Sequence, residues 1–433
     1  MTKDNLKKPK RILKIFLIAG EISGDVLGGK LISSIKKQSS RNSRIRLLGI
    51  GGSNMKVEGL KSIFPMNDLS LFGLAEVIPH IPKILKRINQ TVTEIQKFQP
   101  DILITIDAPD FCFRVAKKLN KLDKQNKIKK VHMIAPSVWA YREGRAKKIA
   151  QLYNLLLTIL PFEPPYFEKY GLKSKFIGHP IVENKIDKSK LLQKRDFYNK
   201  YNLPNKNDII CLTPGSRIGE VNRLLPIFLD AVRIIQQKHK NLSIGIATTD
   251  KIEGVVRTEV NKFKDKTDNV TPHLLRSDKK KNIPQQVRGN ISATNLSVAI
   301  VKDIDDKNSL YRLSRVAIAK SGTNTFELMM AKLPMVVCYK FNWLTGKIGR
   351  RIIKVKYCNL ANIILNKEII PELVQESCSP ELIAKKVKKL MFNKSLIQKQ
   401  ISGTQKVLKI LGVKNKEKSS DLGAKYILEL ISK

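Results

Sequence analysis

The sequence predicts an α/β protein made of two Rossmann-like lobes. At 433 residues the chain exceeds the usual size of a single hydrophobic core. Strand-length apolar runs recur in both halves, each followed by a small-residue turn and a helical stretch. The Lys- and Asn-rich stretch from Asn184 to Asn207 separates the two halves. We therefore expect a first lobe over residues 1–185, a linker over 186–207, a second lobe over 208–378 and basic C-terminal helices over 379–433.

Composition points to a folded protein of a reducing compartment. Hydrophobic residues make up 42% of the chain, and its five cysteines are scattered without a C-x-x-C pair. No apolar run approaches the roughly 20 residues of a spanning helix, which favours a cytoplasmic, non-spanning protein. The net charge of +44 would attract nucleic acid, anionic lipid or phosphorylated substrates. Because lysines are spread along the whole chain, a general bias toward Lys explains the charge equally well.

In the first half, two strand ends carry polar side chains. The run from Ile12 to Ala19 leads into Gly20-Glu21-Ile22-Ser23-Gly24-Asp25, after which Ser23 or Asp25 can cap a helix. The spacing is not G-x-G-x-x-G, so no dinucleotide fingerprint is indicated. The run from Ile102 to Ile106 ends at Asp107, a position where burial would raise the pKa of a carboxyl group that acts as a base. Asp110 is expected to cap the next helix.

The second half offers two phosphate-binding turns. A strand from Ile209 to Leu212 precedes Gly215, Ser216 and Arg217, which provide backbone room, a donor and a planar cation. A strand from Val316 to Ala319 precedes the turn Ser321-Gly322-Thr323. Glu327 lies in the first turn of the helix that follows, where it can accept hydrogen bonds from a ribose. The alternative is an ordinary βαβ crossover with Glu327 facing the helix dipole, and Arg217 paired with Glu220 on the surface.

Two basic amphipathic stretches are either membrane-facing or packed on the core. The first runs from Leu69 to Ile88 and includes Leu71, Phe72 and Leu74, and the second runs from Phe341 to Tyr357 and includes Trp343. The polar region from Lys264 to Asp306 predicts loops.

The motifs together resemble the lipid-A-disaccharide synthase family. Those that carry the resemblance are Gly20-Glu21-Ile22-Ser23-Gly24-Asp25, Ile106-Asp107-Ala108-Pro109-Asp110-Phe111, Pro136-Ser137-Val138-Trp139-Ala140-Tyr141-Arg142, Pro214-Gly215-Ser216-Arg217, Ser321-Gly322-Thr323 with Glu327, and Pro334-Met335-Val336-Val337. They occur in the family's order and span about residue 12 to about residue 380. The segment 272–308 is longer than the family usually has and is expected to be a surface insertion.

This resemblance implies a GT-B glycosyltransferase, with two Rossmann-like lobes facing across a cleft. The implied reaction joins UDP-2,3-diacylglucosamine to 2,3-diacylglucosamine 1-phosphate with inversion and releases UDP. It implies Asp107 as the base, with Glu21 and Ser23 orienting. The implied UDP-sugar site comprises Gly215, Ser216, Arg217, Ser321, Gly322, Thr323, Glu327 and Asn362. No cofactor and no metal are expected, because no acidic or His cluster has metal-ligand spacing.

The two acylated substrates imply a peripheral protein on the cytoplasmic face of the inner membrane, with Leu71, Phe72, Leu74 and Trp343 as contacts. No nucleic-acid partner is expected, and a homodimer is left open. A non-hydrolysing UDP-sugar epimerase of similar fold is the first alternative. A basic nucleic-acid-binding protein is the second, motivated by charge alone.

Overall fold

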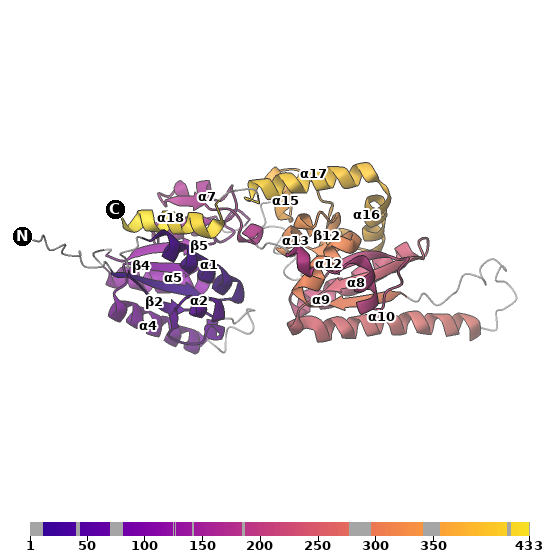
Figure 1. Cartoon of the computed structure of the whole chain (residues 1–433), viewed down its shortest axis with the longest axis horizontal. Coiled ribbons are helices and arrows are strands. Elements are labelled where there is room, and N and C mark those ends of the chain that lie inside the picture. The colour runs from indigo at the N-terminus through magenta and orange to yellow at the C-terminus, as the bar shows by residue number, and fades with distance from the viewer. Residues whose placement is uncertain are drawn as a thin grey trace, which may run out of the picture. The chain divides into compact units, whose positions relative to one another are not determined.

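The computed structural model describes residues 12–39, 44–69, 81–123, 125, 127–140, 143–183, 187–276, 296–340, 356–413 and 417–432. These residues form two compact units (Figure 1). Unit 1 holds the described residues up to Glu183 and from Lys409 onward, and unit 2 holds those between. Within the described part of the chain, no helix is long and apolar enough to cross a membrane.

Unit 1 is a parallel sheet with the strand order β3-β2-β1-β4-β5-β6-β7. Its strands are β1 (Ile12–Ala19), β2 (Arg44–Ile50), β3 (Lys61–Ser62), β4 (Ile102–Ile106), β5 (Lys129–Met133), β6 (Leu155–Thr158) and β7 (Ser174–Phe176). Its helices are α1 (Ile22–Gln38), α2 (Ser53–Val57), η1 (Met66–Leu69), α4 (Ile81–Phe98), α5 (Pro109–Leu122), α6 (Arg145–Ala150), α7 (Pro164–Glu168), η3 (Pro180–Glu183) and α18 (Ser419–Ile431).

Unit 2 repeats this architecture with the strand order β10-β9-β8-β11-β12-β13. Its strands are β8 (Asp208–Thr213), β9 (Leu242–Ala247), β10 (Ser297–Val301), β11 (Ser314–Lys320), β12 (Met335–Tyr339) and β13 (Glu372–Val374). Its helices are η4 (Lys188–Lys190), α8 (Lys194–Lys200), α9 (Ile218–Gln236), α10 (Asp250–Arg276), α12 (Ile304–Leu313), α13 (Asn324–Met330), α15 (Leu360–Leu365), η6 (Gln375–Ser377), α16 (Pro380–Phe392) and most of α17 (Lys394–Ile410).

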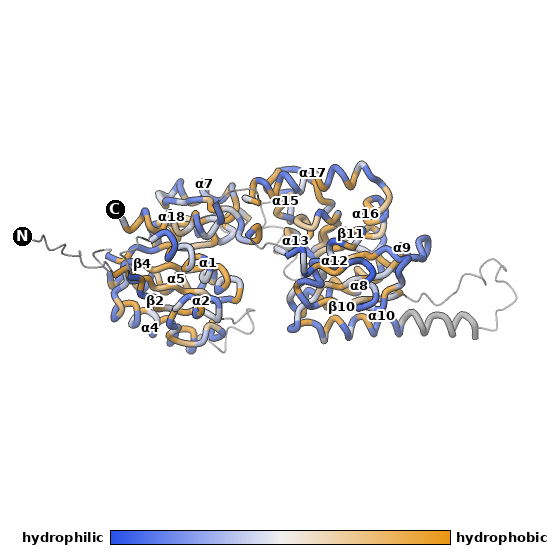
Figure 2. Tube along the Cα trace, in the orientation of Figure 1, coloured by the Kyte–Doolittle hydropathy of each residue, from blue (hydrophilic) through white to orange (hydrophobic). Residues whose placement is uncertain are grey.

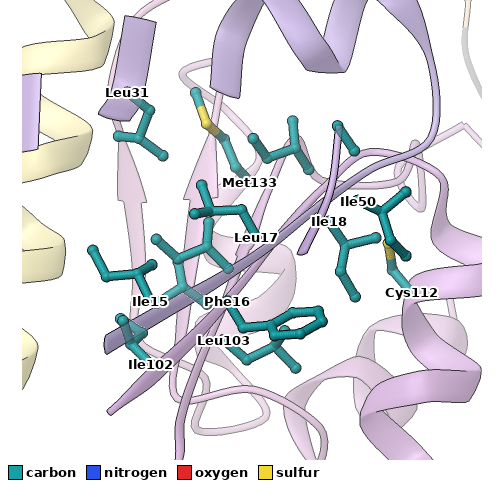
Figure 3. Packing of buried hydrophobic residues seen from close by; sticks show 14 of the residues in the cluster. Ile15, Phe16, Leu17, Ile18, Leu31, Ile50, Ile102, Leu103, Cys112 and Met133 are labelled. Atoms are coloured by element: carbon teal, nitrogen blue, oxygen red, sulfur yellow. The ribbon is translucent and has the colours of Figure 1, made fainter. Parts of the chain in front are cut away.

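The central strands form because their apolar side chains are buried on both faces of each sheet. All five residues of β4 are buried, and its neighbour β1 contributes Ile15, Phe16, Leu17 and Ile18, which pack against Leu31 of α1 and Cys112 of α5 (Figure 3). In Figure 2 the central strands of both units are predominantly hydrophobic, whereas hydrophilic and hydrophobic residues alternate along the coloured part of α10. Continuous apolar strands are typical of parallel sheets covered by helices.

In each sheet the strand order reverses once. The chain moves one way from β1 to β2 and the other way from β4 to β5, and likewise from β8 to β9 and from β11 to β12. Because such crossovers are right-handed, the reversal places the connecting helices on opposite faces and leaves a crevice where the two central strands end. The switch points are β1/β4 in unit 1 and β8/β11 in unit 2.

Two regions differ from the sequence expectation. The stretch from Lys264 to Asp306 was expected to be loops, but it contains the end of α10, all of β10 and the start of α12. The residues 379–433 do not form one body, since α16 packs on α9 in unit 2 while α18 packs on α1 in unit 1 (Figure 1). Ala424 and Ile427 of α18 are buried in the unit 1 core. This burial explains why the chain, after unit 2, comes back to unit 1 at its C-terminal end.

Candidate functional site

Unit 2 contains a cavity of about 220 Å³ at its switch point. The last residues of three neighbouring strands line it, namely Thr213 of β8, Ala247 of β9 and Lys320 of β11. The other lining residues are Gly215, Ser216, Thr248, Thr249, Lys307, Tyr311, Gly322, Thr323, Asn324 and Glu327. The cavity therefore combines hydroxyl groups, a side-chain amide, two ammonium groups and one carboxyl group, which suits a polar anionic ligand.

The loop after β8 supplies one wall. Gly215 has a φ of +123°, and a Cβ on it would lie 2.4 Å from Oε2 of Glu220, so the position requires glycine. The same Oε2 accepts a hydrogen bond from the Ser216 N–H at 3.1 Å. Arg217 is exposed and does not line the cavity, and Glu220 forms an ion pair with Lys320, not with Arg217.

The turn after β11 supplies the facing wall. Gly322, Thr323 and Asn324 line the cavity, and Asn324 Nδ2 donates to Thr213 Oγ1 at 2.8 Å, which ties the turn to β8. Ser321 is not a lining residue, because its hydroxyl donates to the Cys358 carbonyl at 2.8 Å.

Glu327 reaches the cavity from the first turn of α13. The hydroxyl of Tyr311 donates to Glu327 Oε2 at 3.3 Å, and the charge of Lys307 also acts on the carboxyl group. Although the side chain is accessible through the cavity, the surrounding protein displaces enough water to raise the pKa of Glu327. Glu327 is thus held in place and points an acceptor into the cavity.

Asn362 has a structural role in this molecule. It is fully buried, and its Nδ2 donates to the Ile370 carbonyl and to Glu372 Oε1, while its Oδ1 accepts from the Ile369 and Ile370 N–H groups. The amide therefore fixes the segment before β13 and does not line the cavity.

In unit 1, the switch point brings Asp107 next to the loop that contains Glu21. Ala19 and Ile106 are register partners at the ends of β1 and β4, so the residues that follow them are neighbours. A Cβ on Gly20 would lie 2.6 Å from Ala108 Cβ, which shows how closely the two loops approach. Glu21 is half-buried as the N-cap residue of α1, and Ser23 is exposed.

The backbone at Asp107 is in a conformation that L-residues rarely adopt. Asp107 and Ala108 have φ values of 53° and 45°, and the Asp107 N–H donates to the Met133 carbonyl at 3.0 Å. Left-handed backbone at a non-glycine residue is costly and is concentrated at functional sites. Burial raises the pKa of Asp107, opposed by a hydrogen bond from the Ala108 backbone. A half-buried carboxylate of raised pKa is suited to accept a proton.

Two expected capping roles in unit 1 are wrong. Asp25 caps α2 and not its own helix, since its carboxylate accepts from the N–H groups of Gly52 at 2.7 Å, Asn54 at 2.9 Å and Met55 at 3.1 Å. Ala108, not Asp110, is the N-cap residue of α5, and Asp110 contacts Arg145 at 3.3 Å.

The sequence expectation missed several residues that line the unit 2 cavity, among them Lys307, Tyr311 and Lys320. Lys320 directly follows the apolar run of β11, a position that could have identified it. Lys307 and Tyr311 are four residues apart on α12, a spacing that would have indicated one helix face had a helix been expected there.

In unit 1, the buried Glu163 accepts hydrogen bonds from Trp139 Nε1 at 3.4 Å and from the N–H groups of Ile159 and Leu160 at 3.2 and 3.0 Å. The membrane-contact candidates Leu71, Phe72, Leu74 and Trp343 lie outside the described residues.

Two parallel-sheet units, each with polar residues at its switch point, are the architecture of the GT-B fold, which confirms the predicted fold class. The structure is similar to the UDP-GlcNAc 2-epimerase of Neisseria meningitidis bound to UDP-GlcNAc, with a TM-score of 0.54 and 10% identity over 98% of this chain and 100% of that chain. It is also similar to the glycotransferase of kitacinnamycin, with a TM-score of 0.56 and 11% identity over 98% and 99%. At such identities the likeness shows the fold alone.

Sequence comparison gives the family. The profile of the Lipid-A-disaccharide synthetase family matches residues 15–283 and 255–425. The lipid-A-disaccharide synthase of Rickettsia bellii (strain OSU 85-389) is 39% identical over 418 residues, covering 96% of this chain and 98% of that protein. That of Rhodospirillum centenum is 36% identical over 421 residues, covering 97% and 95%. The chain belongs to the lipid-A-disaccharide synthase family, and it is a glycosyltransferase.

Proposed function

We propose that the enzyme transfers 2,3-diacylglucosamine from UDP to the 6-hydroxyl of 2,3-diacylglucosamine 1-phosphate. The observation that carries the donor assignment is the cavity of unit 2, in which hydroxyl, amide and ammonium groups surround a space beside a carboxyl group. Gly215, Ser216, Gly322 and Thr323 provide donors for the diphosphate, and Glu327 accepts from the ribose hydroxyls. Such groups stabilise the negative charge that develops on the leaving UDP.

Asp107 is the proposed base. As the acceptor oxygen bonds to the anomeric carbon of the donor, the bond from that carbon to UDP breaks and the hydroxyl proton passes to the Asp107 carboxylate. A single displacement of this kind inverts the configuration and needs one base. Glu21, the N-cap residue of α1, and Ser23, in the first turn of that helix, are proposed to orient the acceptor.

UDP release, measured with and without acceptor, tests this function. We expect release that depends on acceptor in the wild type, with a β-linked disaccharide as the product. Release or sugar isomerisation without acceptor would contradict it and favour the hydrolase or epimerase alternative. Tight RNA binding without any turnover would favour the nucleic-acid alternative.

We also propose that the protein docks peripherally on the cytoplasmic face of the inner membrane, because both substrates carry acyl chains. In the described part of this region, the basic face of α4 is partly neutralised, since Lys83 and Arg87 both pair with Asp68, at 2.7 and 2.5 Å. The apolar candidates are therefore expected to dominate binding. Changing Leu71, Phe72 and Leu74 together to Ser should lower cosedimentation with anionic liposomes, whereas Val57→Ser, at a position 85% exposed in α2, should not. Unchanged binding of the triple variant would contradict this surface.

A further inference from the structure

Lys320 is a half-buried lysine at the end of β11, and it lines the unit 2 cavity together with Gly215 and Ser216 of the loop after β8. Its Nζ lies 3.0 Å from Glu220 Oε1, and the two side chains are only 18% and 12% exposed. The ammonium group also lies 5.5 Å from the centre of the Tyr339 ring. An anion and an aromatic ring thus hold the Lys320 side chain in one place at the cavity wall.

The carboxylate of Glu220 serves two groups at once. While Oε1 pairs with Lys320, Oε2 accepts the hydrogen bond from the Ser216 N–H at 3.1 Å. Glu220 does not itself line the cavity, although Ser216 and Lys320 both do. It therefore couples the loop after β8 to the end of β11 from behind the cavity wall.

The two lysines of the lining differ in their surroundings. Burial raises the pKa of Glu327, and the positive charge of Lys307 opposes this rise. Glu327 is itself a lining residue, and its proposed role is at the ribose. Lys320 instead pairs with a carboxylate outside the lining. Because an ammonium group has three N–H donors and Glu220 occupies one direction, Lys320 keeps donors for a ligand in the cavity.

We propose that Lys320 binds the diphosphate of the nucleotide sugar, and that Glu220 is a positioning residue that holds the Lys320 ammonium group for that contact and, through the Ser216 N–H, fixes the loop after β8 beside it. This inference rests on the proposed function, since the ligand is the nucleoside diphosphate of the donor. The glycine turns alone do not predict a role for Lys320 or Glu220, because this ion pair joins two segments that are far apart in the sequence.

The first test compares binding of UDP and of uridine by calorimetry. Lys320→Met should raise the Kd of UDP about 10- to 100-fold, as expected for the loss of one hydrogen bond to a charged group, and should leave the Kd of uridine within about threefold. Lys320→Arg should recover most of the UDP affinity because it keeps the charge. Lys320→Gln is a second neutral variant that keeps a polar contact to Glu220 should the Met variant be unstable. Equal losses for UDP and uridine, or no loss for UDP in either neutral variant, would overturn the proposal.

The second test asks whether Glu220 acts through Lys320. Glu220→Gln should weaken UDP binding about three- to tenfold in the wild-type background and by less than about twofold in the Lys320→Met background, because residues that act as a unit are not additive. A purely structural effect of Glu220 would instead give the same loss in both backgrounds. Tighter UDP binding by Glu220→Gln would also overturn its positioning role.

The wild type separates this inference from the proposed function. If the wild-type enzyme neither binds UDP nor releases it from the donor in the presence of acceptor, the proposed function fails. If it does both and Lys320→Met and Lys320→Gln retain the UDP affinity, only the assignment of Lys320 fails.

Discussion

The two units place their polar residues at the same topological position but equip it differently. At β8/β11, hydroxyl groups, an amide and Lys320 line a cavity. Glu220, which forms an ion pair with Lys320, is not among the lining residues. At β1/β4, a carboxyl group follows the strand on a left-handed backbone. We therefore propose that one architecture provides a binding site in unit 2 and a proton acceptor in unit 1, depending on which residue types follow the central strands.

The electrostatics of the two switch points reinforce this contrast. In the described part of the chain no ion pair involves Asp107, and burial raises the pKa of its carboxyl group. Lys320, in contrast, is balanced by Glu220. A proton acceptor benefits from a raised pKa, whereas an anion site benefits from cations that are held in place.

The largest expected effect comes from the unit 1 carboxylate. Asp107→Asn should lower kcat by more than about a hundredfold, since general-base catalysis contributes 10²–10⁴, while the KM for the donor changes little. Steady-state UDP release measures both constants. Asp110→Asn is the matched control, because Asp110 lies three residues further on, in the first turn of α5, and its side chain is 92% exposed. Equal losses in the two variants would contradict the assignment of Asp107.

A smaller effect is expected from the acceptor in the unit 2 cavity. Glu327→Gln should weaken UDP binding about tenfold, because it removes a charged hydrogen-bond acceptor from the ribose diol. Calorimetry with UDP and with ribose-lacking uracil would show the loss for UDP alone. An unchanged UDP affinity would favour the alternative in which Glu327 only compensates the helix dipole of an ordinary βαβ crossover.

The close approach of the two loops in unit 1 gives a third prediction. Gly20→Ala would place a Cβ 2.6 Å from Ala108 Cβ, so the backbone that carries Asp107 must shift. Overpacking of this kind costs about 1–3 kcal/mol of unfolding free energy. We expect a lower midpoint of denaturation together with a lower kcat. Gly144→Ala, where a Cβ meets nothing within 4 Å, should leave both nearly unchanged. A stable Gly20→Ala enzyme with full activity would contradict the close packing.

A fourth prediction concerns the pH dependence of stability and Glu163. Burial raises the pKa of this carboxyl group to about 7, above its ordinary value of 4.5, so the folded state binds more protons than the unfolded state between these values. Wild-type stability should therefore fall relative to that of Glu163→Gln as the pH rises from 5 to 8, by at most about 3 kcal/mol. Denaturant unfolding of both proteins at several pH values measures the difference. A difference that does not change with pH would show that Glu163 titrates at its ordinary value.

Much of the fold and part of the site follow from sequence pattern. The apolar runs of β1, β4, β8 and β11 are long and continuous, and polar residues that come directly after such strands must gather at one sheet edge. Asp107, Gly215, Ser216, Gly322, Thr323 and Glu327 were predicted for this reason.

The remaining features depend on contacts that are distant in the sequence. The pairing of Glu220 with Lys320 spans a hundred positions, and the helix that carries Lys307 and Tyr311 begins in a polar stretch whose strand and helix signals are weak. Asn362 matched a motif, yet its buried amide satisfies four backbone and side-chain groups. Pattern alone does not separate a buried structural amide from one that binds a ligand.

The most direct test of the division between binding and chemistry measures UDP affinity and turnover in Asp107→Asn and Glu327→Gln side by side. We expect Asp107→Asn to bind UDP with the wild-type Kd and to lose turnover, whereas Glu327→Gln should lose UDP affinity. If Asp107→Asn weakens UDP binding as much as Glu327→Gln does, the two switch points do not divide the work in this way.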